Sequence, residues 1–246
     1  MSQEKKINDA ISRWFDETRK RLDALPNRQS EIEGFCLGIL HTVVIYLNAS
    51  RVLQENGFNF PAMALIRITS DVVSKFLWCL QSVSDSEIEN RIQRWEKKTF
   101  AEQKRLLNNL KDVVLPTEPL EKVISDLDKK ADNHLKEMPN TRKLFQDIKN
   151  LFSLDIYALA YLQFNSAVHI DTDLVNKVLM SPLRRNGCDK DILLHEKDVD
   201  SLRIVRLSFF YMTLIVIYKY YSWDSGSLTN EYNRILGFRD KLRTKN

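Results

Sequence analysis

The run LSFFYMTLIVIY, residues 207–218, is the most apolar stretch of this 246-residue chain, and Arg206 and Lys219 bound it on either side. Its 12 residues are fewer than the roughly 20 that cross a membrane. The run therefore predicts a buried core helix. The first residues, MSQEKKINDAISRW, contain no apolar segment typical of a secretory signal. We expect a cytoplasmic protein that does not contact a membrane.

Helical spacing of apolar residues continues outward from this run in both directions. Glycine and proline number only six each, which argues against a turn-rich all-β fold. The spacing, proline breaks and capping residues predict helices over 4–25, 29–55, 61–82, from Ser84 onward, 119–137, 141–152, 153–168, 198–221 and from Ser227. The last two helices before the loop at 181–198 can also be continuous. The fold class predicted is an all-α bundle of seven to nine helices.

No repeat or long linker divides the chain. We expect a single helical domain over 1–246, with an N-terminal amphipathic helix at 1–28, a core at 29–225 and a C-terminal basic helix at 226–246.

The sequence excludes several kinds of catalytic site. Its six glycines form neither a phosphate-binding P-loop nor a dinucleotide-binding turn. The three cysteines form no C-x-x-C pair, and no two of the four histidines have metal-ligand spacing. We therefore expect no cofactor and no metal.

Two constellations of polar residues could carry chemistry. Tyr161, Asn165 and His169 follow one another at four-residue intervals, so they share one face of a predicted helix. The alternative for His169 is that it stabilises the C-terminus of that helix. Arg67 and Asp71 are also four residues apart, in a strongly apolar helix. Their alternative is an internal ion pair that fixes helix packing.

These residues carry a resemblance. The pattern Arg67-x3-Asp71, followed much later by Tyr161-x3-Asn165-x3-His169, resembles an uncharacterised bacterial family of helical proteins, a domain of unknown function, over about residues 30 to 225. That family is distantly similar to the HEPN superfamily (higher eukaryotes and prokaryotes nucleotide-binding), whose active members are metal-independent ribonucleases. The resemblance implies that these five residues are catalytic, with His169 as general acid or base.

The chain departs from the superfamily pattern in one respect. HEPN ribonucleases use Arg-x4-6-His, and residues 162–164, where that arginine would stand, are Leu, Gln and Phe. Either Arg67 replaces the missing guanidinium from a neighbouring helix, or the site is inactive.

Basic residues gather in three places. Seven Lys or Arg against two Glu between residues 91 and 111 give a local charge of +5, while the whole chain carries +4. Arg184 and Arg185 form a second group, and the C-terminus forms a third. The predicted nucleic-acid contacts are Arg91, Arg94, Trp95, Lys97, Lys98, Arg184 and Arg185. The alternatives are a solvated charged face for the basic residues and a core position for Trp95.

The sequence thus favours binding of RNA or a nucleotide, with metal-independent ribonuclease activity in phage defence or as a toxin. The alternative is a non-catalytic protein-interaction module in which the Arg67–Asp71 pair is structural. Partners expected besides RNA are a second copy of the chain or an operon partner protein.

Overall fold

The computed structural model describes residues 3–25, 31–81, 84–111, 122, 125–126, 138–140, 143–144 and 196–237. Six α-helices have described bounds within these ranges, residues 122, 125–126 and 143–144 are also helical, and no described residue is in a strand. The helices are α1 (Gln3–Asp23), α2 (Glu31–Glu55), α3 (Asn59–Leu80), α4 (Asp85–Lys111), α9 (Glu196–Tyr220) and α10 (Gly226–Leu236). The all-α fold class is confirmed.

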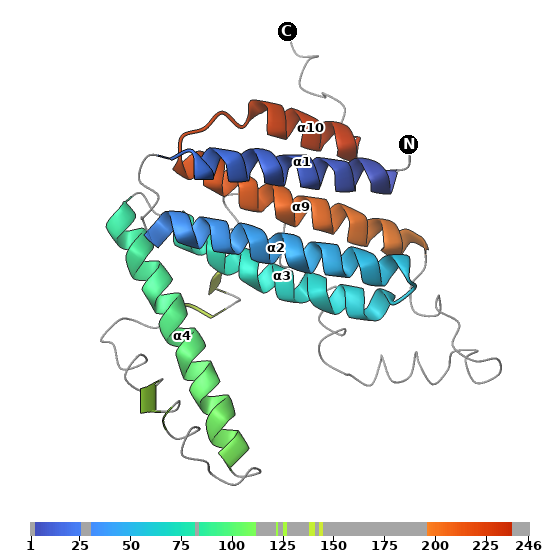
Figure 1. Ribbon diagram of the computed structural model, residues 1–246. Helices are drawn as coiled ribbons and strands as arrows, with labels where there is room; N and C mark the ends of the chain where they lie inside the picture. The colour runs from blue at the N-terminus through green and yellow to red at the C-terminus, as the bar shows by residue number, and fades with distance from the viewer. Residues whose placement is uncertain are drawn as a thin grey trace, which may run out of the picture.

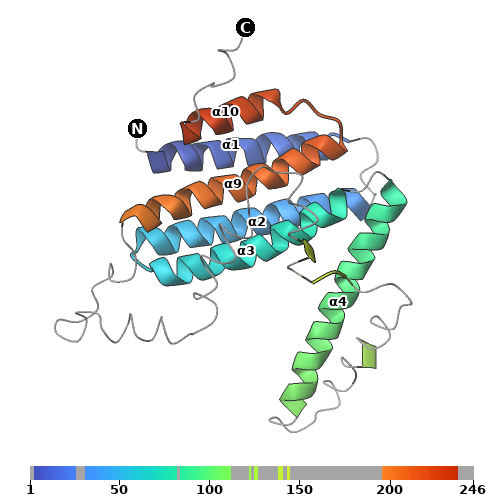
Figure 2. The same ribbon diagram turned by 180° about the vertical axis from the view of Figure 1, so that it is seen from behind.

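Five of the helices run side by side, in the spatial order α10, α1, α9, α2 and α3 (Figure 1). α2 packs extensively along α3, and α3 packs along α9. α4 starts beside one end of the α2–α3 hairpin and then leaves the bundle at a steep angle, as both views show (Figure 2). Most of α4 is therefore free of the other described helices, and its side chains are placed to form a separate surface.

The core of the bundle lies around α9. Phe209, Phe210 and Leu214 of α9 are at most 2% exposed, and they share a core with Phe76 and Leu77 of α3. The helix predicted from the apolar run at 207–218 is thus confirmed as a buried core helix.

Two helices end at glycines that adopt the left-handed backbone conformation. Gly57 follows α2 with φ of 79°, as predicted from the Asn56–Gly57 pair, and Gly237 ends α10 with φ of 69°. Ser84 accepts a hydrogen bond at Oγ from the backbone N–H of Glu87 at 3.4 Å, which supports the predicted capping box. One predicted boundary was wrong, because Asp198 does not cap the final core helix but lies inside α9, two residues after its first residue.

α2 is the one described helix whose length and composition suit a membrane span, with a mean hydropathy of 1.5 over its most apolar window. In the bundle α2 contacts α3, α9 and α1. The core helices of proteins that do not span a membrane can have the same length and hydropathy. The outer side of α2 carries two exposed apolar residues, Ile45 and Val52.

The helices predicted over 141–152 and 153–168 and the loop at 181–198 lie almost wholly outside the described residues. Of the helix predicted at 119–137, only residues 122 and 125–126 are described. The predicted total of seven to nine helices thus stays a prediction.

Candidate nucleic-acid interface

Two of the basic residues on α4 are held against the bundle by Trp78 of α3. The guanidinium groups of Arg91 and Arg94 each lie 5.0 Å from the centre of the Trp78 ring. Arg91 also donates to the backbone carbonyl of Trp78 at 2.6 Å and pairs through Nε with Glu87 at 3.0 Å. These contacts fix the start of α4 to α3 and orient both arginines. Their predicted contact with nucleic acid stays a prediction.

Trp95, predicted to stack on a base, packs instead against the protein core. Its ring lies edge-on to Phe35 of α2, with ring centres 5.5 Å apart, and the ammonium group of Lys75 lies 5.7 Å from its centre. Trp95 is partly buried against the core cluster. The structure therefore supports the core alternative for this residue, because both of its described neighbours belong to the bundle.

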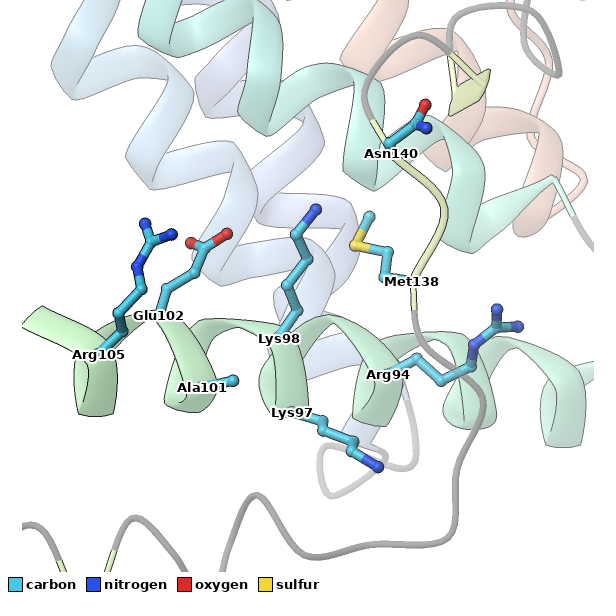
Figure 3. Close-up of a pocket in the computed structure, with 8 residues that line it drawn as sticks. All are labelled: Arg94, Lys97, Lys98, Ala101, Glu102, Arg105, Met138 and Asn140. Carbon is cyan, nitrogen blue, oxygen red and sulfur yellow. The ribbon is translucent and has the colours of Figure 1, made fainter.

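A pocket of about 490 Å³ opens along the next turns of α4. One wall comes from α4 and the other from the segment that carries Met138 and Asn140 (Figure 3). The α4 wall carries four cationic side chains and one carboxylate. The lining residues are Arg94, Lys97, Lys98, Ala101, Glu102, Arg105, Met138 and Asn140.

The cationic residues occupy this wall because of their spacing. Arg94, Lys98, Ala101 and Arg105 recur at intervals of four, three and four residues, so they form one stripe along the helix. Figure 3 shows Lys98 rising from α4 toward Met138, while Lys97 extends from the lower edge of the same helix, and both residues line the pocket. Within the described part of the chain, neither Lys98 nor Arg105 forms an ion pair. Both residues line the pocket, so their charges contribute to its positive wall.

Five of the eight pocket residues were not predicted as site residues. Glu102 and Arg105 entered the sequence analysis only as part of the local charge, and Ala101 not at all. Their helical phase relative to Arg94 and Lys98 was the signal that could have found them. Met138 and Asn140 come from a separate segment, and no spacing along the sequence predicts that they face α4.

The predicted pair of Arg67 and Asp71 is present on α3. Arg67 Nη1 lies 2.6 Å from Asp71 Oδ2, and Arg67 also donates to Ser70 Oγ at 3.4 Å. The Arg67 side chain is 7% exposed and that of Asp71 is 33% exposed. This geometry supports the alternative of an internal ion pair, because the guanidinium is turned away from solvent. The catalytic role of either residue stays a prediction.

The most deeply buried charge in the described chain is one that the sequence analysis missed as a site. Arg206 of α9 is 1% exposed. Its guanidinium donates to Glu4 of α1 at 2.8 Å and to Gln54 of α2, and Glu4 also pairs with Arg203. Burial lowers the pKa of Arg206, and the Glu4 carboxylate acts in the opposite direction. The interactions of Arg206 thus connect α9 with α1 and α2 at one end of the bundle.

The two described cysteines are buried and free. Burial raises the pKa of the Cys36 thiol to about 12 and also raises that of Cys79, while the nearby Arg91 and Arg94 lower the latter. Neither thiol is a nucleophile near neutral pH, because the reactive species is the thiolate.

The remaining predicted site residues lie outside the described residues. They are Tyr161, Asn165 and His169 of the helical constellation and Arg184 and Arg185 of the loop. The predicted contribution of Arg67 to a site with His169 therefore stays a prediction.

Residues 35–183 match the model of a family described as a family of unknown function, DUF5677. The match covers more than half of the chain, so the chain belongs to this family. No curated protein and no solved structure matches the chain. The expected membership of an uncharacterised family is confirmed. The distant HEPN relationship and the bacterial origin stay predictions.

Proposed function

We propose that this member of a family of unknown function binds RNA through the pocket on α4. The observation that carries the proposal is the charge of the pocket wall, with four cationic side chains against one carboxylate. The wall thus carries an excess of three positive charges, and it belongs to the stretch at residues 91–111 whose local charge is +5. Phosphate groups are attracted to such a concentration of cations, and the gain is largest where counterions are released.

The rigidity of the start of α4 supports the same function. Arg94 is at once part of the pocket and held over Trp78. Lys98 and Arg105 extend the stripe away from this fixed point. Because the helix that carries them is anchored, little freedom is lost when a phosphate chain is bound.

The proposal extends to metal-independent cleavage of the bound RNA, with a role in phage defence or as a toxin. This extension is supported by the resemblance to HEPN ribonucleases. In it, His169 acts as general acid or base on the 2′-hydroxyl, beside Tyr161 and Asn165. Arg67 is not assigned to the phosphate in this scheme, because its side chain is buried against Asp71. Cleavage should persist in chelator and be lost in His169→Ala.

A second candidate function is a non-catalytic protein-interaction module. It is favoured by the buried ion pair of Arg67 and Asp71 and by the exposed apolar residues Ile45 and Val52 on the outer side of α2. This candidate predicts no affinity for RNA at any salt concentration.

Binding of a fluorescent single-stranded RNA over a salt series tests the proposal. Two cations of the pocket are replaced in Lys98→Gln/Arg105→Gln, and the control Lys6→Gln/Lys20→Gln removes the same charge from exposed positions on α1. The plot of log affinity against log salt should become shallower by about 1.4 in the pocket variant, because each phosphate contact to a single strand contributes about 0.7. The control should keep nearly the parental slope.

Two results would contradict the proposal. Absence of RNA binding even at low salt would favour the interaction module. An equal loss of slope in both variants would show that the chain attracts RNA by its overall charge and not through the pocket.

A further inference from the structure

The single carboxylate of the pocket does not suit a surface that only attracts phosphates. Glu102 stands between Arg105 and Lys98 along α4, and Figure 3 shows its carboxylate on the same side of the helix as both cations. A carboxylate repels phosphate but accepts hydrogen bonds from N–H groups. Within an RNA chain the ribose offers a single hydroxyl donor, whereas a base can offer two adjacent N–H donors that match both oxygens of a carboxylate. Glu102 is thus placed to contact a base while its neighbours contact the backbone.

The opposite wall supplies the apolar and amide groups that a base requires. Met138 is 5% exposed and lies across the pocket from α4. Methionine sulfur makes favourable contacts with aromatic rings. Asn140 Oδ1 accepts the backbone N–H of Lys143 at 3.0 Å. This hydrogen bond orients the amide and leaves its Nδ2 group to donate to a ligand.

The size of the pocket restricts what enters it. About 490 Å³ lies within the range of about 300–1,000 Å³ that is typical of small-ligand pockets. A double helix meets a protein over a broad surface and keeps its bases stacked. Recognition of single-stranded RNA instead uses unstacked bases inserted singly into pockets.

We propose that this pocket binds one unstacked guanine nucleotide of a single-stranded RNA. Guanine is the base with two adjacent donors on its pairing edge, N1–H and N2–H, and the two oxygens of Glu102 accept both. Met138 and Ala101 contact the face of the base. Lys98 and Arg105 contact the adjoining phosphates. The inference rests on the proposed RNA binding, and it assigns base specificity to Glu102.

Two oligonucleotides test the assignment by fluorescence anisotropy. One is an oligouridine, and the other is the same oligomer with one central guanosine. The guanosine oligomer should bind at least about fivefold more tightly, the lower end of what one bidentate contact to a base supplies. Glu102→Gln should abolish this preference, because an amide offers one acceptor in place of two, and should strengthen oligouridine binding, because the pocket wall loses its one negative charge. The control Glu96→Gln makes the same charge change on α4 outside the pocket and should keep the preference.

The outcomes separate this inference from the function on which it rests. Binding of oligouridine with no preference for guanosine would overturn the assignment to guanine and leave RNA binding standing. A stronger preference for a central adenosine or cytidine would also overturn it. Equal weakening of both oligomers in Glu102→Gln would show that Glu102 does not read the base. Failure of both oligomers to bind at low salt would overturn the proposed function itself.

Discussion

Replacement of Glu4 by alanine should strongly destabilise the protein, because Glu4 is the carboxylate partner of a buried arginine. Glu4 is the carboxylate partner of Arg206, at 2.8 Å. Arg206 is 1% exposed, so its charge is compensated by protein groups and not by water. Gln54 would then be its remaining described partner. Loss of one partner from a buried ion pair costs about 3–5 kcal/mol, because the other charge stays buried without compensation.

Replacement of Arg206, the other member of the pair, should lower the free energy of unfolding much less. In Arg206→Met the buried charge is gone, the apolar part of the side chain is kept, and Glu4 still contacts Arg203. Replacement of buried ion pairs by apolar residues is often neutral or stabilising by about 1–4 kcal/mol. The double variant Glu4→Ala/Arg206→Met should therefore be more stable than Glu4→Ala alone.

Urea unfolding followed by far-ultraviolet circular dichroism measures all three free energies of unfolding. The loss in Glu4→Ala corresponds to a fall in Tm of about 6–20 °C for a chain of this size. Glu17→Ala, at an exposed position of the same helix, is the control and should change stability by less than about 0.5 kcal/mol. A cost below about 1 kcal/mol for Glu4→Ala, or no rescue in the double variant, would refute the reasoning.

Three further predictions concern other parts of the bundle. Gly38→Ala should raise the free energy of unfolding by about 0.5–1 kcal/mol, because a Cβ there meets no atom within 4 Å and glycine is unfavourable inside a helix; destabilisation in urea unfolding would show that another surface covers this position. Arg67→Met and Asp71→Asn should together cost about 0.5–3 kcal/mol less than the sum of the single losses, whereas additive losses would show that the pair does not interact. Cys36 and Cys79 should resist alkylation in the native protein below about pH 8.5, the usual thiol pKa, because burial raises both pKa values. The measurement uses a variant in which the third cysteine is replaced by serine. Labelling of the folded protein as fast as of the unfolded protein would contradict this prediction.

Much of the helical order of this chain could be predicted from local sequence. The bounds of α1 to α3 follow from apolar spacing and from the breaks at Pro26 and Gly57, and they agree with the structure to within two residues. These signals act over one or two turns, so they are visible in a short window of sequence. The start of α9 was less well predicted because Asp198 is a suitable capping residue that the helix does not use.

The parts that could not be predicted depend on contacts between distant segments. Arg206 marked the end of an apolar run, but it is in phase with the buried Leu202 and Phe210 and faces the core with them. Its partner Glu4 is 202 residues away in the chain, and no periodicity links the two. The pocket depends in the same way on Met138 lying opposite α4. The sequence predicts the positive charge of α4, but it does not predict the second wall, with Met138, that turns this charged surface into a pocket.

The family match and the bundle do not cover the same residues. The match ends at residue 183, yet α9 begins at Glu196 and forms the core against α3. Phe76 and Leu77 of α3 are completely buried in the core cluster that α9 completes. Without α9 this apolar face of α3 would be exposed to water, at a cost of about 1.5–3 kcal/mol for each large side chain. In the described part of the chain the buried face of α3 therefore relies on α9, which lies outside the matched range, and the surface on α4 depends on this packing because α4 is anchored to α3 through Trp78.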